Sequence, residues 1–146
     1  MGTIVVGIDG SPGSRRALEW AVREARAHSD EILAIYAWSY PIVVGMFDSV
    51  LPVPEGVDLE KEAAEFLQRT VDKIAGDAGV RIRIEVVQGS AGNALVDASR
   101  DADVLVVGSR GFGGFRGLLL GSTGQQCAVH AHCPVLIVPH EERERA

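Results

Sequence analysis

Short apolar runs alternate along this chain with longer stretches whose apolar residues recur at helical spacing. The runs are rich in β-branched residues and are bounded by glycine, serine or proline, which is typical of buried strands. The longer stretches place their apolar residues on one face, and Ser11 followed by Pro12 has the form of a helix start. Strands are expected over residues 3–9, 31–38, 81–88, 104–107 and 135–138. Helices are expected from Pro12, from Glu55 to about Ala78, from Ser90, and from Ser122 to Ala131.

Strand and helix alternate throughout, which predicts an α/β fold of three layers, a parallel five-stranded sheet between helices. The third strand alternates apolar Ile82, Ile84 and Val86 with charged residues, so one of its faces is less buried and it belongs near an edge. Right-handed crossovers then favour the strand order 3-2-1-4-5. The chain direction reverses between strands 1 and 4 in this order, and ligands bind beyond the carboxyl ends of strands at such a point. We therefore expect Asp9 and Gly108 to meet there.

Size and charge narrow the possible partners. The 146 residues suit one domain over residues 1–140, followed by a charged tail over residues 141–146. The net charge of -6 argues against a nonspecific grip on nucleic acid and against binding to an anionic membrane surface. We expect no nucleic-acid or membrane partner.

The cysteines and the chain start indicate the compartment. Cys127 and Cys133 form no CxxC pair and no metal-ligand spacing, so we expect two buried, reduced thiols. No apolar run approaches the ~20 residues of a membrane span. The start of the sequence runs directly into a strand without the basic region of a signal peptide. These features predict a cytoplasmic protein.

A glycine-rich segment follows the fourth strand. Gly108-x2-Gly111-x9-Gly121-Ser122 lies between an apolar strand and an amphipathic helix, where glycines allow close backbone approach and helix amides attract anions. It is not a P-loop, because no lysine follows Lys73, and it lacks the GxGxxG of dinucleotide-binding proteins. A structural turn is the plainer alternative, but four glycines within residues 111–117 exceed what a turn needs. The segment predicts a phosphate-binding loop.

With their context, these residues resemble the universal stress protein family, in its ATP-binding branch. The resemblance rests on the glycine motif, on Val5-Val6-Gly7-Ile8-Asp9-Gly10-Ser11, on the stretch over residues 102–111, and on Cys133-Pro134-Val135-Leu136-Ile137-Val138-Pro139. It covers essentially the whole chain and is weakest over residues 39–54.

The resemblance implies a site for ATP and magnesium. Asp9 would lie near the ribose and any bound Mg²⁺, with Gly7 close by. Ala37, with Tyr36 as a second candidate, would line the adenine pocket opposite Val107. Gly124 stands where the family usually has a second hydroxyl, a departure that Thr123 would partly offset. The phosphates would be held by Gly108, Ser109, Arg110, Gly111, Gly121, Ser122 and Thr123.

Some charged residues near the motif have a plainer interpretation. Arg110 and Arg116 are candidates for phosphate contact, but solvated loop charges are the commoner case. Asp9 could equally act as a turn or cap residue, although its place at the chain reversal favours a functional role. His130 and His132 have no partner pattern and are expected to pack or face solvent.

The last strand suggests a partner. Val135, Leu136, Ile137 and Val138 are all apolar, yet the expected strand order puts them at an edge, where exposed apolar strands promote aggregation. The simplest cover is the same strand of a second copy, running antiparallel about a two-fold axis. The resemblance implies the same homodimer.

Residues 39–54 are too long for a plain loop and predict either a lid over the base or a variable connector.

Three functions remain open from the sequence. The first is an ATP-binding, homodimeric stress-response regulator that is not an enzyme, because no base, lysine or arginine finger is placed for phosphoryl transfer. The second is a slow magnesium-dependent ATPase in which Asp9 and the metal position water. The third is an interaction module that binds no nucleotide. The adenine preference comes only from the resemblance, and the sequence leaves ATP, AMP and cyclic nucleotides as alternatives.

Overall fold

The computed structural model describes residues 2–39, 56–111 and 120–139. Its elements are β1 (Thr3–Gly7), α1 (Pro12–His28), β2 (Glu31–Trp38), α2 (Leu59–Ala75), β3 (Ile82–Gln88), α3 (Ala91–Ala98), a short 3-10 turn (Ser99–Asp101), β4 (Val104–Gly108), α4 (Ser122–His130) and β5 (Val135–Val138). Some interpretations made from the sequence lie outside the described residues. They concern most of the loop over residues 39–54, Arg116 and the glycines near it, and the charged tail.

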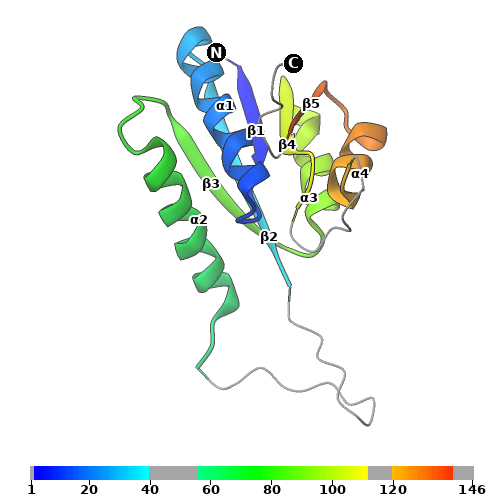
Figure 1. Cartoon of the computed structure of the whole chain (residues 1–146). Helices are drawn as coiled ribbons and strands as arrows, with labels where there is room; N and C mark the ends of the chain where they lie inside the picture. The colour runs from blue at the N-terminus through cyan, green and yellow to red at the C-terminus, as the bar shows by residue number, and fades with distance from the viewer. Residues whose placement is uncertain (1, 40–55, 112–119, 140–146) are drawn as a thin grey trace, which may run out of the picture.

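All five strands form one parallel sheet in the order β3-β2-β1-β4-β5, which confirms the order expected from the sequence (Figure 1). β1 is central, with Val5 beside Leu33 of β2 on one side and beside Leu105 of β4 on the other. Because all strands point the same way, their carboxyl ends lie along one edge. Asp9 and Gly108 follow neighbouring strands at that edge.

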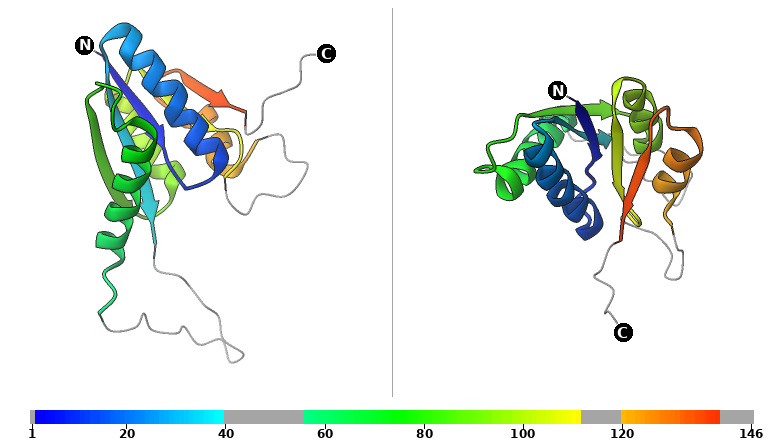
Figure 2. Two further views of the ribbon diagram at one scale, coloured as in Figure 1. Left: turned by 60° about the vertical axis from the view of Figure 1, so that its left-hand side comes forward. Right: turned by 90° about the horizontal axis from the view of Figure 1, so that it is seen from above.

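Helices cover the sheet on both faces, as the alternation of elements predicted (Figure 2). α1 and α2 cover one face, where alternate strand residues such as Val6 and Val106 pack against Leu18 and Leu67. α3 and α4 cover the other face, where Val5 and Leu105 pack against Leu95. Across the described part of the chain, no helix is long and apolar enough to span a bilayer.

Several elements begin or end a few residues from their expected bounds, and local hydrogen bonding explains the larger differences. β1 stops at Gly7 instead of Asp9, because the chain turns at Gly10, whose φ is +83°. α2 begins after Asp58, whose side chain accepts a hydrogen bond from the Lys61 amide, and it ends at Ala75 instead of about Ala78. Glu55, the expected start of this helix, lies outside the described residues.

The two edge strands differ in character. β3 exposes Arg83 and Glu85, which confirms the less-buried edge that its alternating pattern predicted. Arg83 also pairs with Glu31 of β2 at 3.1 Å. At the other edge, three of the four residues of β5 are partly exposed, although all four are apolar. The uncovered apolar edge expected from the sequence is therefore present in the single chain.

Both cysteines are free, as expected, but only one is fully buried. Cys127 of α4 is shielded from solvent, and burial raises the pKa of its thiol to about 11. Cys133, which precedes β5, is half-buried, so the expectation of two buried thiols was wrong for this residue. Burial, then the negative charge of Asp103, raise the pKa of Cys133 as well. Neither thiol is therefore activated as a nucleophile.

Ser99 joins the end of α3 to the chain before β5. It is fully buried, its hydroxyl donates to the Val96 carbonyl at 2.6 Å, and it accepts from the His132 amide at 2.9 Å. Ser99→Ala leaves that amide without its partner and should lower the free energy of unfolding by about 1–3 kcal/mol, measured by urea denaturation. Thr70→Ala, which removes only a bond within α2, is the matched control. Equal stabilities for both variants would contradict this role for Ser99.

Candidate functional site

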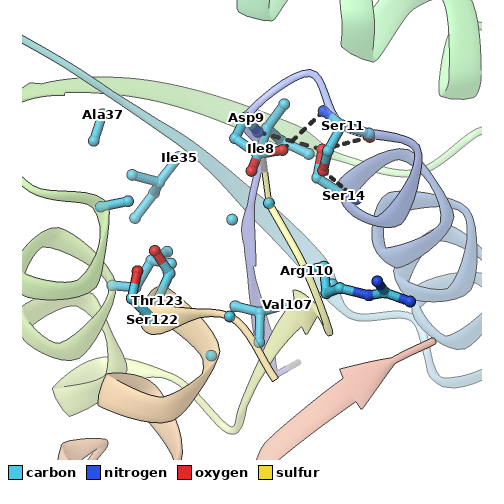
Figure 3. Close-up of a pocket in the computed structure, with 17 residues that line it drawn as sticks. Ile8, Asp9, Ser11, Ser14, Ile35, Ala37, Val107, Arg110, Ser122 and Thr123 are labelled. Carbon is cyan, nitrogen blue, oxygen red and sulfur yellow. Dashed lines mark hydrogen bonds between the residues drawn. The ribbon is translucent and has the colours of Figure 1, made fainter. Parts of the chain in front are cut away.

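A cavity of about 350 Å³ opens at the carboxyl edge of the sheet, over the ends of β1 and β4 (Figure 3). Its size falls in the range of small-molecule sites. Residues from β1, β2, β4, α1, α3 and α4 line it, so segments far apart in the sequence meet there. It is lined by Gly7, Ile8, Asp9, Ser11, Ser14, Ile35, Ala37, Ala91, Leu95, Val107, Gly108, Arg110, Gly111, Gly121, Ser122, Thr123 and Gly124.

One wall is the turn from β1 into α1, which a closed set of hydrogen bonds holds in place (Figure 3). Asp9 accepts from the Ser11 amide at 2.8 Å, and the Asp9 amide donates to the Ser14 hydroxyl at 3.3 Å. Ser11 caps α1 by accepting from the Ser14 amide at 3.2 Å, as the Ser-Pro pair predicted. One carboxylate oxygen of Asp9 is thus bound to the turn. The other lies against Gly111, only 2.5 Å from where a side-chain carbon on that glycine would stand.

The opposite wall is the start of α4, which differs from the other described helices. α1, α2 and α3 each follow a cap residue whose side chain accepts a hydrogen bond from a backbone amide of the first turn. These cap residues are Ser11 for α1, Asp58 for α2 and Ser90 for α3. α4 begins after Gly121, which has no side chain to do so. Within the described residues, the amides of its first turn therefore keep their hydrogen-bonding capacity for a ligand. They also lie at the positive end of the helix dipole, which makes this the part of the cavity best suited to an anion.

Hydroxyl groups add to this wall. The side chains of Ser122 and Thr123 face the cavity in Figure 3. Both can donate to an anion in addition to the backbone amides.

The end of the cavity between α3 and the sheet is apolar. Ile35 and Val107 are buried side chains of β2 and β4 that face it, and Leu95 of α3 packs behind Gly7. Ala37 lies beyond Ile35 on the same face of β2. A flat apolar group attached to an anion would match a cavity that is apolar at one end and rich in donors at the other.

Gly108 lets the two halves of the site approach. A side-chain carbon there would stand 2.7 Å from the backbone carbon of Gly13, in the first turn of α1. Only a residue without a side chain allows α1 to pack this closely against the end of β4. Gly108 therefore has a role in packing the fold.

The structure brings almost all the predicted site residues together. Gly7, Asp9, Ala37, Val107, Gly108, Arg110, Gly111, Gly121, Ser122, Thr123 and Gly124 all line the cavity. Ser109 is the exception, because its backbone is used within the fold. Its amide donates to the Val138 carbonyl at 2.8 Å, and its carbonyl accepts from the Gly121 amide at 2.7 Å.

Two other side chains lie differently from what a sequence reading expects. Tyr36, the second candidate for the adenine pocket, belongs to the opposite face of β2, where its ring lies 5.0 Å from that of Phe66. That alternative was wrong, because residues on either side of Ala37 in a strand point the other way. The guanidinium of Arg110 extends away from Ser122 and Thr123 in Figure 3.

Sequence reasoning missed several lining residues. Ser11 was assigned to the helix start alone, and the lining residues Ser14, Ala91 and Leu95 were not predicted as site residues. A usable signal was present, because all helices that follow parallel strands begin at the same edge of the sheet. Every such helix start was therefore a candidate for the site, whether or not glycines preceded it.

The residues around Asp9 fit a magnesium ion only together with a phosphorylated ligand. Among the described residues that line the cavity, Asp9 is the single carboxylate. No group of three or more histidine, cysteine or acidic side chains in the described ranges could hold a metal. Magnesium accepts one protein carboxylate plus phosphate and water oxygens, so Asp9 could take that part.

Comparison with known proteins gives the same assignment for the fold. The family model described as "Universal stress protein family" matches residues 1–139. The universal stress protein Rv2624c of Mycobacterium tuberculosis is 36% identical over 140 residues, which cover 94% of this chain and 48% of that protein. This chain thus spans about half the length of that relative.

Two solved structures share the architecture. A universal stress protein in complex with cAMP matches with a TM-score of 0.71 at 29% identity, covering 96% of this chain and 98% of that chain. An Arabidopsis thaliana protein of the same family, with AMP bound, matches with a TM-score of 0.67 at 21% identity, covering 100% and 97%. Sequence, strand order and family model agree, and the chain belongs to the universal stress protein family.

Proposed function

We propose that this chain binds an adenine nucleotide in the cavity between β1 and α4 and acts as a homodimeric stress-response regulator. The uncapped start of α4 carries the proposal, since it is the one described helix that leaves its first-turn amides for a ligand. ATP with magnesium is the ligand that the resemblance implied. The cAMP and AMP complexes of the two structural relatives support an adenine nucleotide of some kind.

The cavity suggests how such a ligand lies. The base would occupy the apolar end near Ala37, Ile35 and Val107, and the phosphate would bind the amides at the start of α4. The ribose would then lie near Asp9, whose carboxylate can accept hydrogen bonds from sugar hydroxyls. This orientation uses both the apolar and the polar end of the site.

Gly121 provides a direct test of the helix start. An aspartate there can accept a hydrogen bond from the first turn of α4 and puts a negative charge where the phosphate should lie. Gly121→Asp should weaken adenine-nucleotide binding by about tenfold or more, measured by titration calorimetry with AMP, cAMP and ATP. The free energy of unfolding should stay the same or rise by up to about 0.5 kcal/mol, because the helix gains a cap.

Gly121→Ala is the matched control. The nearest atoms to an added side-chain carbon are 3.5 Å away, so alanine fits, and it offers no acceptor to the amides. Its nucleotide affinity should remain close to that of the unaltered protein. If Gly121→Asp folds and binds as tightly as Gly121→Ala, the phosphate does not lie at this helix.

Binding without turnover is the mode of action that we favour. The lining residues in the described part of the chain include no lysine and no histidine, and Asp9 is already bound to the turn of α1 through one oxygen. Incubation with labelled ATP and magnesium should release no phosphate above a protein-free blank under single-turnover conditions. Steady release that Asp9→Ala abolishes would favour the slow ATPase instead.

The second copy would cover β5. This strand is apolar, stands at the sheet edge and keeps three partly exposed residues, so it offers an unpaired strand to an identical one. Ile137→Lys places a charge in that contact and should give a monomer or insoluble protein, measured by light scattering. Arg83→Lys, at the opposite edge, is the control and should leave the dimer intact. A soluble Ile137→Lys dimer would count against this interface.

A further inference from the structure

We propose that Gln126 of α4 is a positioning residue for the nucleotide site, because its hydrogen bond to Asn93 of α3 holds the start of α4 in place beside the cavity. The proposal rests on the proposed nucleotide site and adds to it a residue that stands outside the cavity lining. Gln126 lies about one turn beyond Ser122, where the helix begins. It would act on the ligand only through the helix that carries the binding groups.

Apolar packing gives α4 little of its position. Of the nine residues of this helix, Gly124 and Cys127 are the buried ones, and Gly124 has no side chain to pack. Helices in proteins are held mainly by the apolar face that they bury, so a helix with so small a buried face depends more on polar contacts. A polar contact near the start of α4 should therefore affect where its first turn lies.

Gln126 makes such a contact with α3, which lies beside α4 on the same face of the sheet (Figure 1). The side-chain amide of Gln126 donates to the side-chain carbonyl of Asn93 at 2.6 Å. Asn93 is itself held, because its backbone amide donates at 3.1 Å to the hydroxyl of Ser90, the cap of α3. The bond thus joins α4 to the capped first turn of α3, where Ala91 lines the cavity.

Gly92 makes room for the side chain of Gln126. The three atoms nearest to an added side-chain carbon on Gly92 all belong to the Gln126 carboxamide, and the closest of them would overlap with it. The φ of Gly92 is not among the positive ones, so the close contact and not the backbone conformation favours glycine here. The carboxamide of Gln126 therefore lies directly against the backbone of α3.

α3 offers a fixed reference because it is anchored to the central strand. Leu95 is buried, and its methyl carbon lies 2.7 Å from where a side-chain carbon on Gly7 of β1 would stand. Contacts thus run from β1 to Leu95, along α3 to Asn93, and through Gln126 to α4. Loss of the last contact would free the first turn of α4 from the wall of the cavity while the apolar end of the cavity stays intact.

Gln126→Ala should weaken AMP binding by about two- to tenfold and change adenosine binding by less than about twofold, measured by titration calorimetry. The two ligands differ by one phosphate group, so a displaced helix start affects AMP alone, whereas a general loss of structure affects both. Gln68→Ala is the matched control, because it removes a glutamine that donates to Asp72 at 2.8 Å on α2, outside the cavity. It should change neither affinity.

Gly92→Ala tests the same contact without removing either partner. The added methyl group displaces the Gln126 carboxamide from Asn93, so AMP binding should weaken about as much as in Gln126→Ala, again with adenosine binding unchanged. Alanine is the better helix former, so weaker AMP binding would not reflect a less stable α3. In the Gln126→Ala background, Gly92→Ala should have no further effect on AMP binding, because the atoms that it would meet are gone.

The outcomes separate this proposal from the one on which it rests. AMP binding that neither Gln126→Ala nor Gly92→Ala weakens would overturn the positioning role and leave the nucleotide site intact. Equal weakening of AMP and adenosine would also overturn it, as would a further loss from Gly92→Ala in the Gln126→Ala background. No heat from the unaltered protein with either ligand at millimolar concentration would overturn the nucleotide site and this role together.

Discussion

The parallel pairing of β1 with β4 is the constraint on which the rest of the structure depends. It aligns Val5 with Leu105 and joins Thr3 to Asp103, residues 100 positions apart in the sequence. Both strands point the same way, so the turn that holds Asp9 and the segment that begins at Gly108 leave the sheet at the same edge. The cavity exists because of that pairing, and neither segment forms it alone.

The helix starts then divide this edge into fixed and open parts. Ser11 and Ser90 satisfy the first turns of α1 and α3 from within the chain, which makes those turns rigid parts of the cavity wall. Gly121 cannot do the same for α4. Within the described residues, no side chain caps the first turn of α4, so its backbone amides are suited to a small anionic ligand.

Much of this was predictable from the sequence, because the signals were periodic. Apolar β-branched runs gave the strands, the alternation around Ile84 gave the edge, and the glycine spacing indicated which loop lies over the switch point. The details that failed depend on contacts between distant side chains. No feature of the neighbouring sequence shows that the Ser109 amide donates a hydrogen bond to the Val138 carbonyl, or that the Leu120 side chain fills the space beside Gly124. Tyr36 failed for a simpler reason, since a strand sends neighbouring residues to opposite faces.

The backbone of Ser109 has a wider consequence. Through it, β5 and the start of α4 are connected by two successive short hydrogen bonds: the Gly121 amide donates to the Ser109 carbonyl, and the Ser109 amide donates to the Val138 carbonyl. Dimer formation through β5 and ligand binding at the start of α4 would thus be connected through the backbone of Ser109. Thermodynamic coupling between two sites acts equally in both directions. A genetic screen for altered ligand sensitivity should therefore recover substitutions on β5, far from any atom that the ligand touches.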